Sequence, residues 1–376
     1  MKLTSRERLM RIFRNEEIDR PSLKLWGAGL DTEYCLHPAY LPVNRMAAEK
    51  TDLFGGAPFP FDIYGGTNMS RYCEIWDTDT DDPNWYDHHT TFHTPRGDLH
   101  MTARYSRRGD PGYTMEYMIK EPEDIDKILS MEYTPFSFDR AGYDAANAQM
   151  GERGIVMIGL NHAAYTAQIL CGSETLAYLA IDAEERLSEM IRVFRDRILD
   201  HTKAILSLGI AEPVFSWVDP EVILPPLMRP DDFRTYVRDT DRSICDAFHN
   251  AGGHVWVHSH GKVANFIDDF IDMGADVLNP LEPPKNGDID MNDIIARYGS
   301  RIGWEGNIEI QEILLSSKER IAALIDECVL AGAKSGRFIL CPSAGYMEYP
   351  RPTEQYIDNL LFYLQYGSEA VERCKK

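Results

Sequence analysis

Between residue 154 and the carboxyl terminus, short apolar runs rich in Val and Ile alternate with longer stretches in which apolar residues recur with helical periodicity. Runs of this length suit buried strands, and the longer stretches suit amphipathic helices. The strands are predicted at 155–159, 210–217, 254–258, 277–280, 302–305 and 338–341. The helices are predicted at 184–208, 230–250, 262–273, 290–298, 310–333 and 353–366.

The amino-terminal part of the chain has a different pattern. An amphipathic helix is predicted over 4–13 and ends near 19–21, and an apolar strand follows at 22–26. Residues 27–150 show no regular alternation and carry many aromatics, paired glycines and acidic turns, with a hairpin indicated around 94–98. We interpret this segment as a long, irregular insertion over one end of the fold.

Strands separated by crossover helices must pair in parallel. Counting the strand at 22–26, about seven or eight such units are present, which suits a closed (β/α)8 barrel of the TIM type better than an open sheet. We therefore predict an α/β fold in which residues 1–376 form one barrel domain. The sequence lacks a Gly-x-Gly-x-x-Gly phrase after a strand and a Walker motif, which disfavours a dinucleotide or phosphate-loop site.

Composition excludes several classes of partner and location. Sixty acidic residues against 39 basic ones leave a net charge of −21, whereas a nucleic-acid partner would demand a basic face. The first residues are charged where a signal peptide needs an apolar core, and no run is long and apolar enough for a membrane span, so a cytoplasmic protein is expected. The seven cysteines lack Cys-x-x-Cys spacing, which fits neither a disulfide framework nor a zinc ribbon.

The active site of such a barrel forms where the strands run into the loops that follow them. His258 and His260 end one predicted strand and are two residues apart, hence on one face if the strand persists. Gly261 then permits a sharp exit of the chain. Two imidazoles are thus expected to converge on one point, and the alternative is one histidine bonded to a neighbouring loop with the other exposed.

Further metal-binding residue types follow other strands. Cys341 ends the last apolar run, and its alternative role is that of a buried small hydrophobe. Glu221, Glu282 and Glu305 also follow strands, and each is a candidate ligand or proton acceptor, or alternatively a helix cap or a partner of an arginine. Nitrogen, sulfur and carboxylate ligands together suit a mononuclear zinc site with an open position for catalysis.

Several phrases along the chain resemble one protein family in their order and spacing. The sequence is similar to the uroporphyrinogen decarboxylase superfamily, and within it to the corrinoid-dependent methyltransferase branch, over nearly its whole length. The resemblance implies a (β/α)8 barrel and, for the methyltransferases, a zinc ion at the bottom of a funnel above which a separate corrinoid protein docks. The matching phrases lie at 4–8, 19–21, 94–97, 225–233, 258–261, 274–284 and 306–309.

Departures from the family pattern bear on the reaction. The decarboxylases resemble Arg-Gln-Ala-Gly-Arg near the first strand, where the arginines hold substrate carboxylates, but residues 23–29 here read Leu-Lys-Leu-Trp-Gly-Ala-Gly. Decarboxylation of a polyanionic substrate is therefore the weaker interpretation. The thiol-methylating branch uses His-x-Cys and a later Cys. In this chain His260 stands in the place of the first of these cysteines and Ala344 in the place of the second, and Cys341 lies three residues before Ala344.

Zinc is a stronger Lewis acid with imidazole and carboxylate ligands than with thiolate ligands. A strong Lewis acid favours the cleavage of an ether, because it polarises the ether oxygen. We therefore expect methyl transfer from a small methylated compound, a methoxylated aromatic, to a corrinoid protein, with zinc polarising the ether oxygen. Trp26, Tyr64 and Trp217 are candidates to wall a flat substrate.

Two alternatives stay open, namely transfer from methylcorrinoid to a thiol or pterin, and a metal-free decarboxylase or binding protein. The corrinoid is expected to come from a partner, because the sequence lacks Asp-x-His-x-x-Gly. The sequence also leaves open whether the chain forms a homodimer.

Overall fold

Eight parallel strands curl into a barrel-shaped sheet, which confirms the expected α/β (β/α)8 fold. The computed structural model describes residues 2–30, 38–299, 301–348 and 351–375. The strands lie in the order β1–β12–β11–β10–β9–β8–β7–β2. Their bounds are β1 Ser22–Leu23, β2 Leu53–Gly56, β7 Gly154–Asn161, β8 Val214–Val218, β9 His254–His258, β10 Val277–Asn279, β11 Gly303–Ile308 and β12 Phe338–Pro342.

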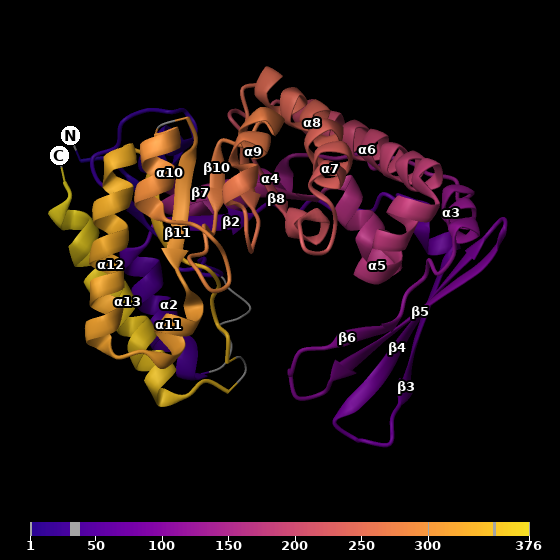
Figure 1. Cartoon of the computed structure of the whole chain (residues 1–376), viewed down its shortest axis with the longest axis horizontal. Helices are drawn as coiled ribbons and strands as arrows, with labels where there is room; N and C mark the ends of the chain where they lie inside the picture. The colour runs from indigo at the N-terminus through magenta and orange to yellow at the C-terminus, as the bar shows by residue number, and fades with distance from the viewer. Residues whose placement is uncertain (1, 31–37, 300, 349–350, 376) are drawn as a thin grey trace.

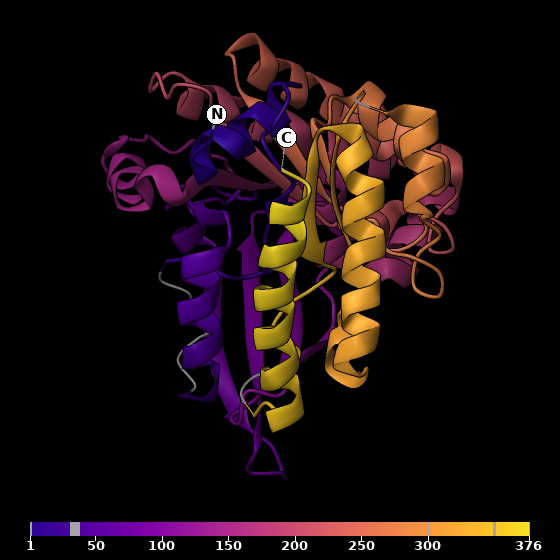
Figure 2. The same cartoon turned by 90° about the vertical axis from the view of Figure 1, so that its left-hand side faces the viewer.

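Helices cover the outside of this sheet (Figure 1). Figure 2 shows α2, α13 and α12 standing side by side along one flank, and the two chain termini close together at one end of the barrel. The covering helices are α2 Leu41–Lys50, α5 Ala163–Asp182, α6 Glu184–Leu206, α7 Pro230–Phe233, α8 Asp239–Asn250, α9 Ile267–Met273, α10 Met291–Tyr298, α11 Ile310–Leu315, α12 Lys318–Gly332 and α13 Glu354–Arg373. Helix α1 Ser5–Phe13 instead packs against the residues inside the barrel.

Side chains alternate between the two faces of each strand. In β8, Phe215 packs against Phe248 of α8, whereas Val214 joins the small apolar cluster inside the barrel together with Trp256 of β9. This period of two sorts each strand into outward residues that bind the helix layer and inward residues that fill the barrel. The inward residues near the carboxyl ends of the strands are therefore the ones that can build a site.

The segment 27–150 is more regular than the sequence pattern suggested. It supplies barrel strand β2 and helix α2, and the hairpin indicated around 94–98 is the turn between two strands of a second sheet. This antiparallel sheet has the order β3–β4–β5–β6, and we call it the arm. Its strands are β3 Cys73–Asp79, β4 Trp85–Thr94, β5 Gly97–Ser106 and β6 Tyr113–Glu116, and helices α3 Pro122–Leu129 and α4 Ala141–Met150 follow it.

The arm extends beyond the barrel in the direction in which the barrel strands point (Figure 1). The turn between β5 and β6 comes close to the loop after β12, where Asp110 and Arg351 form an exposed ion pair of 3.9 Å. The arm thus stands beside the carboxyl-terminal mouth of the barrel and touches its far rim.

β1 and β2 are the two ends of the barrel sheet, and among the described residues their backbones are joined at the base of the barrel. The amide of Asp52 donates to the carbonyl of Leu23 at 2.8 Å. The buried guanidinium of Arg8 in α1 binds Asp52 at 2.9 Å and Asp19 at 2.8 Å, and Ser22 donates its hydroxyl to Asp52 at 2.5 Å. Side chains therefore close the barrel at its base, where a β-ladder is missing.

Two expectations concern the chain as a whole. Within the described ranges, no helix has the length and apolarity needed to cross a membrane. The six described cysteines are free thiols, in agreement with the absence of a disulfide framework. The seventh, Cys35, lies outside the described residues.

Candidate functional site

Residues from three neighbouring strand ends meet at the mouth of the barrel. His258 is the last residue of β9, and the ladders place it beside Val218 of β8 and Asn279 of β10. The rings of His258 and His260 lie edge to face with their centroids 4.6 Å apart. The two imidazoles therefore come together, as their spacing in the sequence predicts.

The protonation of His258 is fixed by its neighbour Asn279. The side-chain nitrogen of Asn279 donates to Glu305 at 2.9 Å, so its oxygen faces Nδ1 of His258 at 2.5 Å and accepts that proton. Burial, aided by the nearby His260, lowers the pKa of His258 to about 3. His258 is thus a neutral imidazole with the lone pair of Nε2 left for another partner.

His260 is held by a carboxylate instead of an amide. Its Nδ1 lies 3.0 Å from Glu282, which also accepts a 2.7 Å hydrogen bond from the amide of Gly261. Burial lowers the pKa of His260, but the hydrogen bond and charge of Glu282 outweigh it and leave the pKa raised. Burial likewise raises the pKa of Glu282, and the bonds from His260 and Gly261 outweigh it and leave that pKa lowered.

Glu221 lies on the other side of His260 and is short of partners. Its Oε2 atom is buried and has no hydrogen-bond partner. Burial, with a smaller contribution from the charge of Asp219, raises the pKa of Glu221 to about 7. A carboxylate oxygen without a partner beside an imidazole is suited to binding a cation or a proton.

Glu305 and Cys341 lie deeper, beneath the two histidines. Glu305 is fully buried and accepts hydrogen bonds from Lys24 at 2.7 Å and from Trp256 at 2.8 Å, besides that of Asn279. Burial raises the pKa of the Cys341 thiol well above its usual value, and Glu305 is its neighbour. Of the six predicted site residues, these two do not face the open mouth.

Lys24 and Asn279, which the sequence analysis did not single out, complete the buried layer beneath the histidines. Lys24 is buried under the rings of Phe54, Trp256 and Trp26, with its ammonium 4.0, 4.5 and 4.9 Å from their centroids. Lys24, Glu305, Asn279 and His258 form one continuous chain of polar contacts. Inward alternation from the strand at 22–26 is the signal that would have identified Lys24.

The three aromatic candidates have different positions. Trp26 stacks on His258 with a centroid distance of 4.4 Å and on Trp256 at 5.6 Å, so it belongs to the site. Trp217 packs against His162 at 4.5 Å and Tyr64 against Phe194 at 5.7 Å, both in the layer between sheet and helices.

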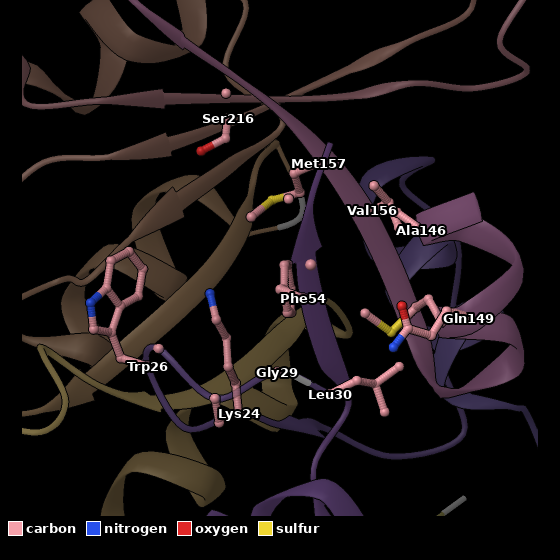
Figure 3. Close-up of a pocket in the computed structure, with 16 residues that line it drawn as sticks. Lys24, Trp26, Gly29, Leu30, Phe54, Ala146, Gln149, Val156, Met157 and Ser216 are labelled. Carbon is pink, nitrogen blue, oxygen red and sulfur yellow. The ribbon is translucent and has the colours of Figure 1, made fainter. Parts of the chain in front are cut away.

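Two cavities flank the histidine pair. One, of about 500 Å³, lies inside the barrel, and its lining includes Trp26, Lys24 and Ser216 (Figure 3). The other, of about 750 Å³, opens at the mouth, and its lining includes His260 and Glu221. We call them the interior cavity and the mouth cavity.

The donors fit a metal ion in part. Within the described part of the chain, no three His, Cys, Asp or Glu side chains are already gathered into a group that could hold a metal ion. His258 and His260 nevertheless have their Nδ1 atoms occupied, as metal-bound histidines do, and Oε2 of Glu221 lacks a partner. Cys341 does not fit, because it is fully buried and lies against Glu305.

Comparisons with known proteins agree with this architecture. The family model described as uroporphyrinogen decarboxylase (URO-D) matches residues 116–354, and no curated protein sequence matches the chain. A methyltransferase from Methanosarcina mazei superposes with a TM-score of 0.59 at 15% identity, covering 96% of this chain and 98% of that one, which shows a shared fold. A match to ZgEngAGH5_4, with a TM-score of 0.34, 11% identity and coverage of 65% and 78%, carries no weight.

Proposed function

Because the chain belongs to the uroporphyrinogen decarboxylase family, we propose, from that membership and the site, that it is a methyltransferase of a corrinoid-linked system. In this proposal a methyl group moves from a small methoxylated aromatic compound to a corrinoid carried by another protein. The shared fold with a methyltransferase supports the class of reaction. The donor chemistry at the mouth supports the kind of methyl donor.

The observation that carries the proposal is the pair of oriented imidazoles beside an unsatisfied carboxylate. Asn279 and Glu282 hold the Nδ1 atoms of His258 and His260, and Glu221 presents an oxygen without a partner. We propose that these three side chains hold zinc after a small rearrangement. Zinc bound there supplies Lewis acidity that polarises the oxygen of a methyl ether.

The other two glutamates have supporting roles in this proposal. Glu282 is kept as a carboxylate by His260 and Gly261, so it orients the imidazole and balances its charge. Glu305 is enclosed by Lys24, Trp256 and Asn279, so it holds the layer beneath the histidines in place. Neither is left free to carry a proton to a substrate.

The interior cavity suits a flat apolar ring. Trp26, Phe54, Met157 and Leu30 contribute to its walls, and aromatic or thioether surfaces pack well on such ligands. Among the described residues that line it, Lys24 is the one charged side chain, and it is already paired with Glu305. A tetrapyrrole with several carboxylates would find no free cation among these residues, which disfavours decarboxylation as the reaction.

The corrinoid is proposed to come from a partner protein, because the sequence lacks the Asp-x-His-x-x-Gly phrase of corrinoid-binding domains. Under this proposal the chain purified alone carries no tightly bound corrinoid, and its absorbance spectrum shows none. A corrinoid that copurifies with the chain alone in stoichiometric amount contradicts it.

Zinc analysis and a methyl-transfer assay test the proposal together. The purified protein should bind about one zinc, as mononuclear catalytic sites do, and His258→Ala or His260→Ala should lower zinc affinity by about tenfold or more. His88→Ala, which alters a histidine paired with Asp77 on the arm, is the matched control and should bind zinc normally. With reduced cobalamin and a panel of methoxybenzenes, the cob(I)alamin band should decay as one phenol forms per methyl transferred.

Two results would overturn the proposal. If neither added zinc nor loss of either histidine changes activity or stability, the metal role is wrong. If methyl moves only from methylcobalamin to a thiol or pterin, the direction is wrong and the alternative reaction is supported.

A further inference from the structure

We propose that the interior cavity is a binding site for flat, uncharged small molecules and that they enter it through the barrel wall between β1 and β2. The proposal goes beyond methyl transfer, because it concerns binding and access alone. It rests on the free edges of β1 and β2, on the residues that line the cavity and on the rings that separate it from the mouth.

Among the residues that the structure describes, no ladder joins the first and second strands of the barrel wall. Above the hydrogen bond from Asp52 to Leu23, no backbone hydrogen bond joins the described residues 24–28 to 53–56. Each edge is instead held to its other neighbour, since Lys24 donates to Leu340 of β12 and Ala57 to Met157 of β7. The described edges of β1 and β2 therefore share no ladder beyond Asp52, and we call the space between them the seam.

The interior cavity reaches both sides of β2. On the inner side its lining includes Phe54, whose ring centroid lies 4.0 Å from the ammonium of Lys24. On the outer side it includes Ala146 and Met150 of α4, and a Cβ built on Gly55 would lie 2.9 Å from the terminal methyl of Met150. Figure 3 shows Trp26 and Lys24 on one side of the strand that carries Phe54, and Ala146 and Gln149 on the other. One cavity that contacts both faces of an edge strand passes around its free edge or over its carboxyl end, and the free edge of β2 is the seam.

Small residues keep this passage open. Gly56, Gly159 and Ser216 line the cavity, and a Cβ added at Gly56 or Gly159 would meet no atom within 4 Å. A volume of about 500 Å³ is within the usual range for small-molecule sites, and its exposed lining is mainly apolar. The ligand class is therefore a flat apolar molecule of one or two rings.

Stacked rings separate the interior cavity from the mouth cavity. Trp26 lines the interior cavity, and its ring stacks on His258 with a centroid distance of 4.4 Å. His258 in turn makes an edge-to-face contact, with a centroid distance of 4.6 Å, with His260, which lines the mouth cavity. A ligand that came from the mouth cavity would have to pass this stack of rings. Entry through the seam leaves it in place, so two reactants could approach the histidines from different sides.

Association kinetics of a fluorescent ring compound test the route without any chemistry. The probe is 2-methoxynaphthalene, mixed with the full-length protein in a stopped-flow fluorimeter. Gly56→Trp places bulk at the inner end of the passage, on the face of β2 that carries Phe54. Gly56→Ala is the matched small control, and Leu227→Trp places the same bulk at the rim of the mouth cavity. Denaturant unfolding of each variant shows that it is folded.

The seam route predicts a specific combination of rates. Gly56→Trp should slow association by about tenfold or more, because restricted access lowers on-rates, and should slow dissociation by a similar factor. Gly56→Ala and Leu227→Trp should keep the wild-type rates. If Gly56→Trp fills the cavity and abolishes binding, Ala146→Phe at the outer end of the passage decides, and it should slow association.

Three outcomes contradict the proposal. They are a wild-type protein that does not bind the probe, an association rate that neither Gly56→Trp nor Ala146→Phe lowers, and a Leu227→Trp variant that slows association as much as Gly56→Trp. None of them depends on zinc or on methyl transfer, so failure of the proposed function leaves this test intact.

Discussion

Glu282 holds His260 through the Nδ1 atom of its ring. The carboxylate lies 3.0 Å from Nδ1 of His260 and accepts a second hydrogen bond, of 2.7 Å, from the amide of Gly261. One side chain thereby fixes both the ring orientation and the backbone turn that follows it. The position of His260 thus depends on β10 as well as on its own strand.

Glu282→Gln should weaken zinc binding by about 10- to 100-fold, because loss of a carboxylate partner makes the imidazole a poorer and less fixed ligand. Competition with a chromophoric chelator measures the affinity. Glu212→Gln, which alters a partly exposed glutamate paired with Arg14, is the control and should bind zinc as the wild type does. Equal affinities for all three proteins would show that Glu282 does not support a metal ligand.

Lys24→Met should destabilise the fold by about 3–5 kcal/mol, because it leaves the fully buried Glu305 without its cation. The free energy of unfolding from urea titrations measures the effect. The partly exposed pair of Arg14 and Glu212 offers a contrast, and Arg14→Met should cost only about 0–1 kcal/mol. Similar costs for the two variants would mean that the buried network does not depend on Lys24.

His260→Cys should lower the rate of ether cleavage even where zinc is retained, because a thiolate donates more charge to the metal and weakens its Lewis acidity. Decay of the cob(I)alamin band with methoxybenzenes, methylamines and methyl thioethers measures the rate, and zinc content is determined on the same sample. Turnover with amines or thioethers alone would reject an ether as the methyl donor.

Asp19 should contribute stability that depends on pH. Burial raises its pKa, but the hydrogen bonds from Arg8 and from the amide of Leu3 outweigh it and leave the pKa below the usual value. A carboxyl whose pKa is lowered by folding stabilises the protein fully above its unfolded pKa, of about 3.9, and loses this contribution as the pH falls through the folded value. Asp19→Asn should therefore destabilise the protein at pH 7, and the difference from wild type should shrink below about pH 4. A difference that stays constant down to pH 2 would contradict this.

The sequence predicted the convergence at the mouth, but not the depth of each residue. His258, His260 and Glu282 follow neighbouring strands, so the rule that strand ends share one edge places them together. Glu305 was taken as the end of a strand, but β11 continues to Ile308, which leaves Glu305 within the barrel layer. The alternation along β11 then directs it inward, beneath the histidines.

Elements without a clear period were harder to predict. β2 is only four residues long and ends in two glycines, so it shows no alternation. Helix α5 is apolar on most sides because it is largely enclosed, which removes the amphipathic signal. In the arm, the exposed half of the sheet pairs aromatic residues with charged ones, as where Trp76 lies opposite His89, and the pattern resembles a loop.

The contacts of Arg8 have a consequence for how the barrel can change shape. Arg8 ties the chain before β1, through Asp19, to the chain before β2, through Asp52, so the first helix fixes the circumference at the amino-terminal end of the strands. At the other end, the edges of β1 and β2 share no ladder in the part of the chain that the structure describes. The barrel can therefore widen at its mouth by changing the angle between two strands, without breaking a backbone hydrogen bond of the sheet.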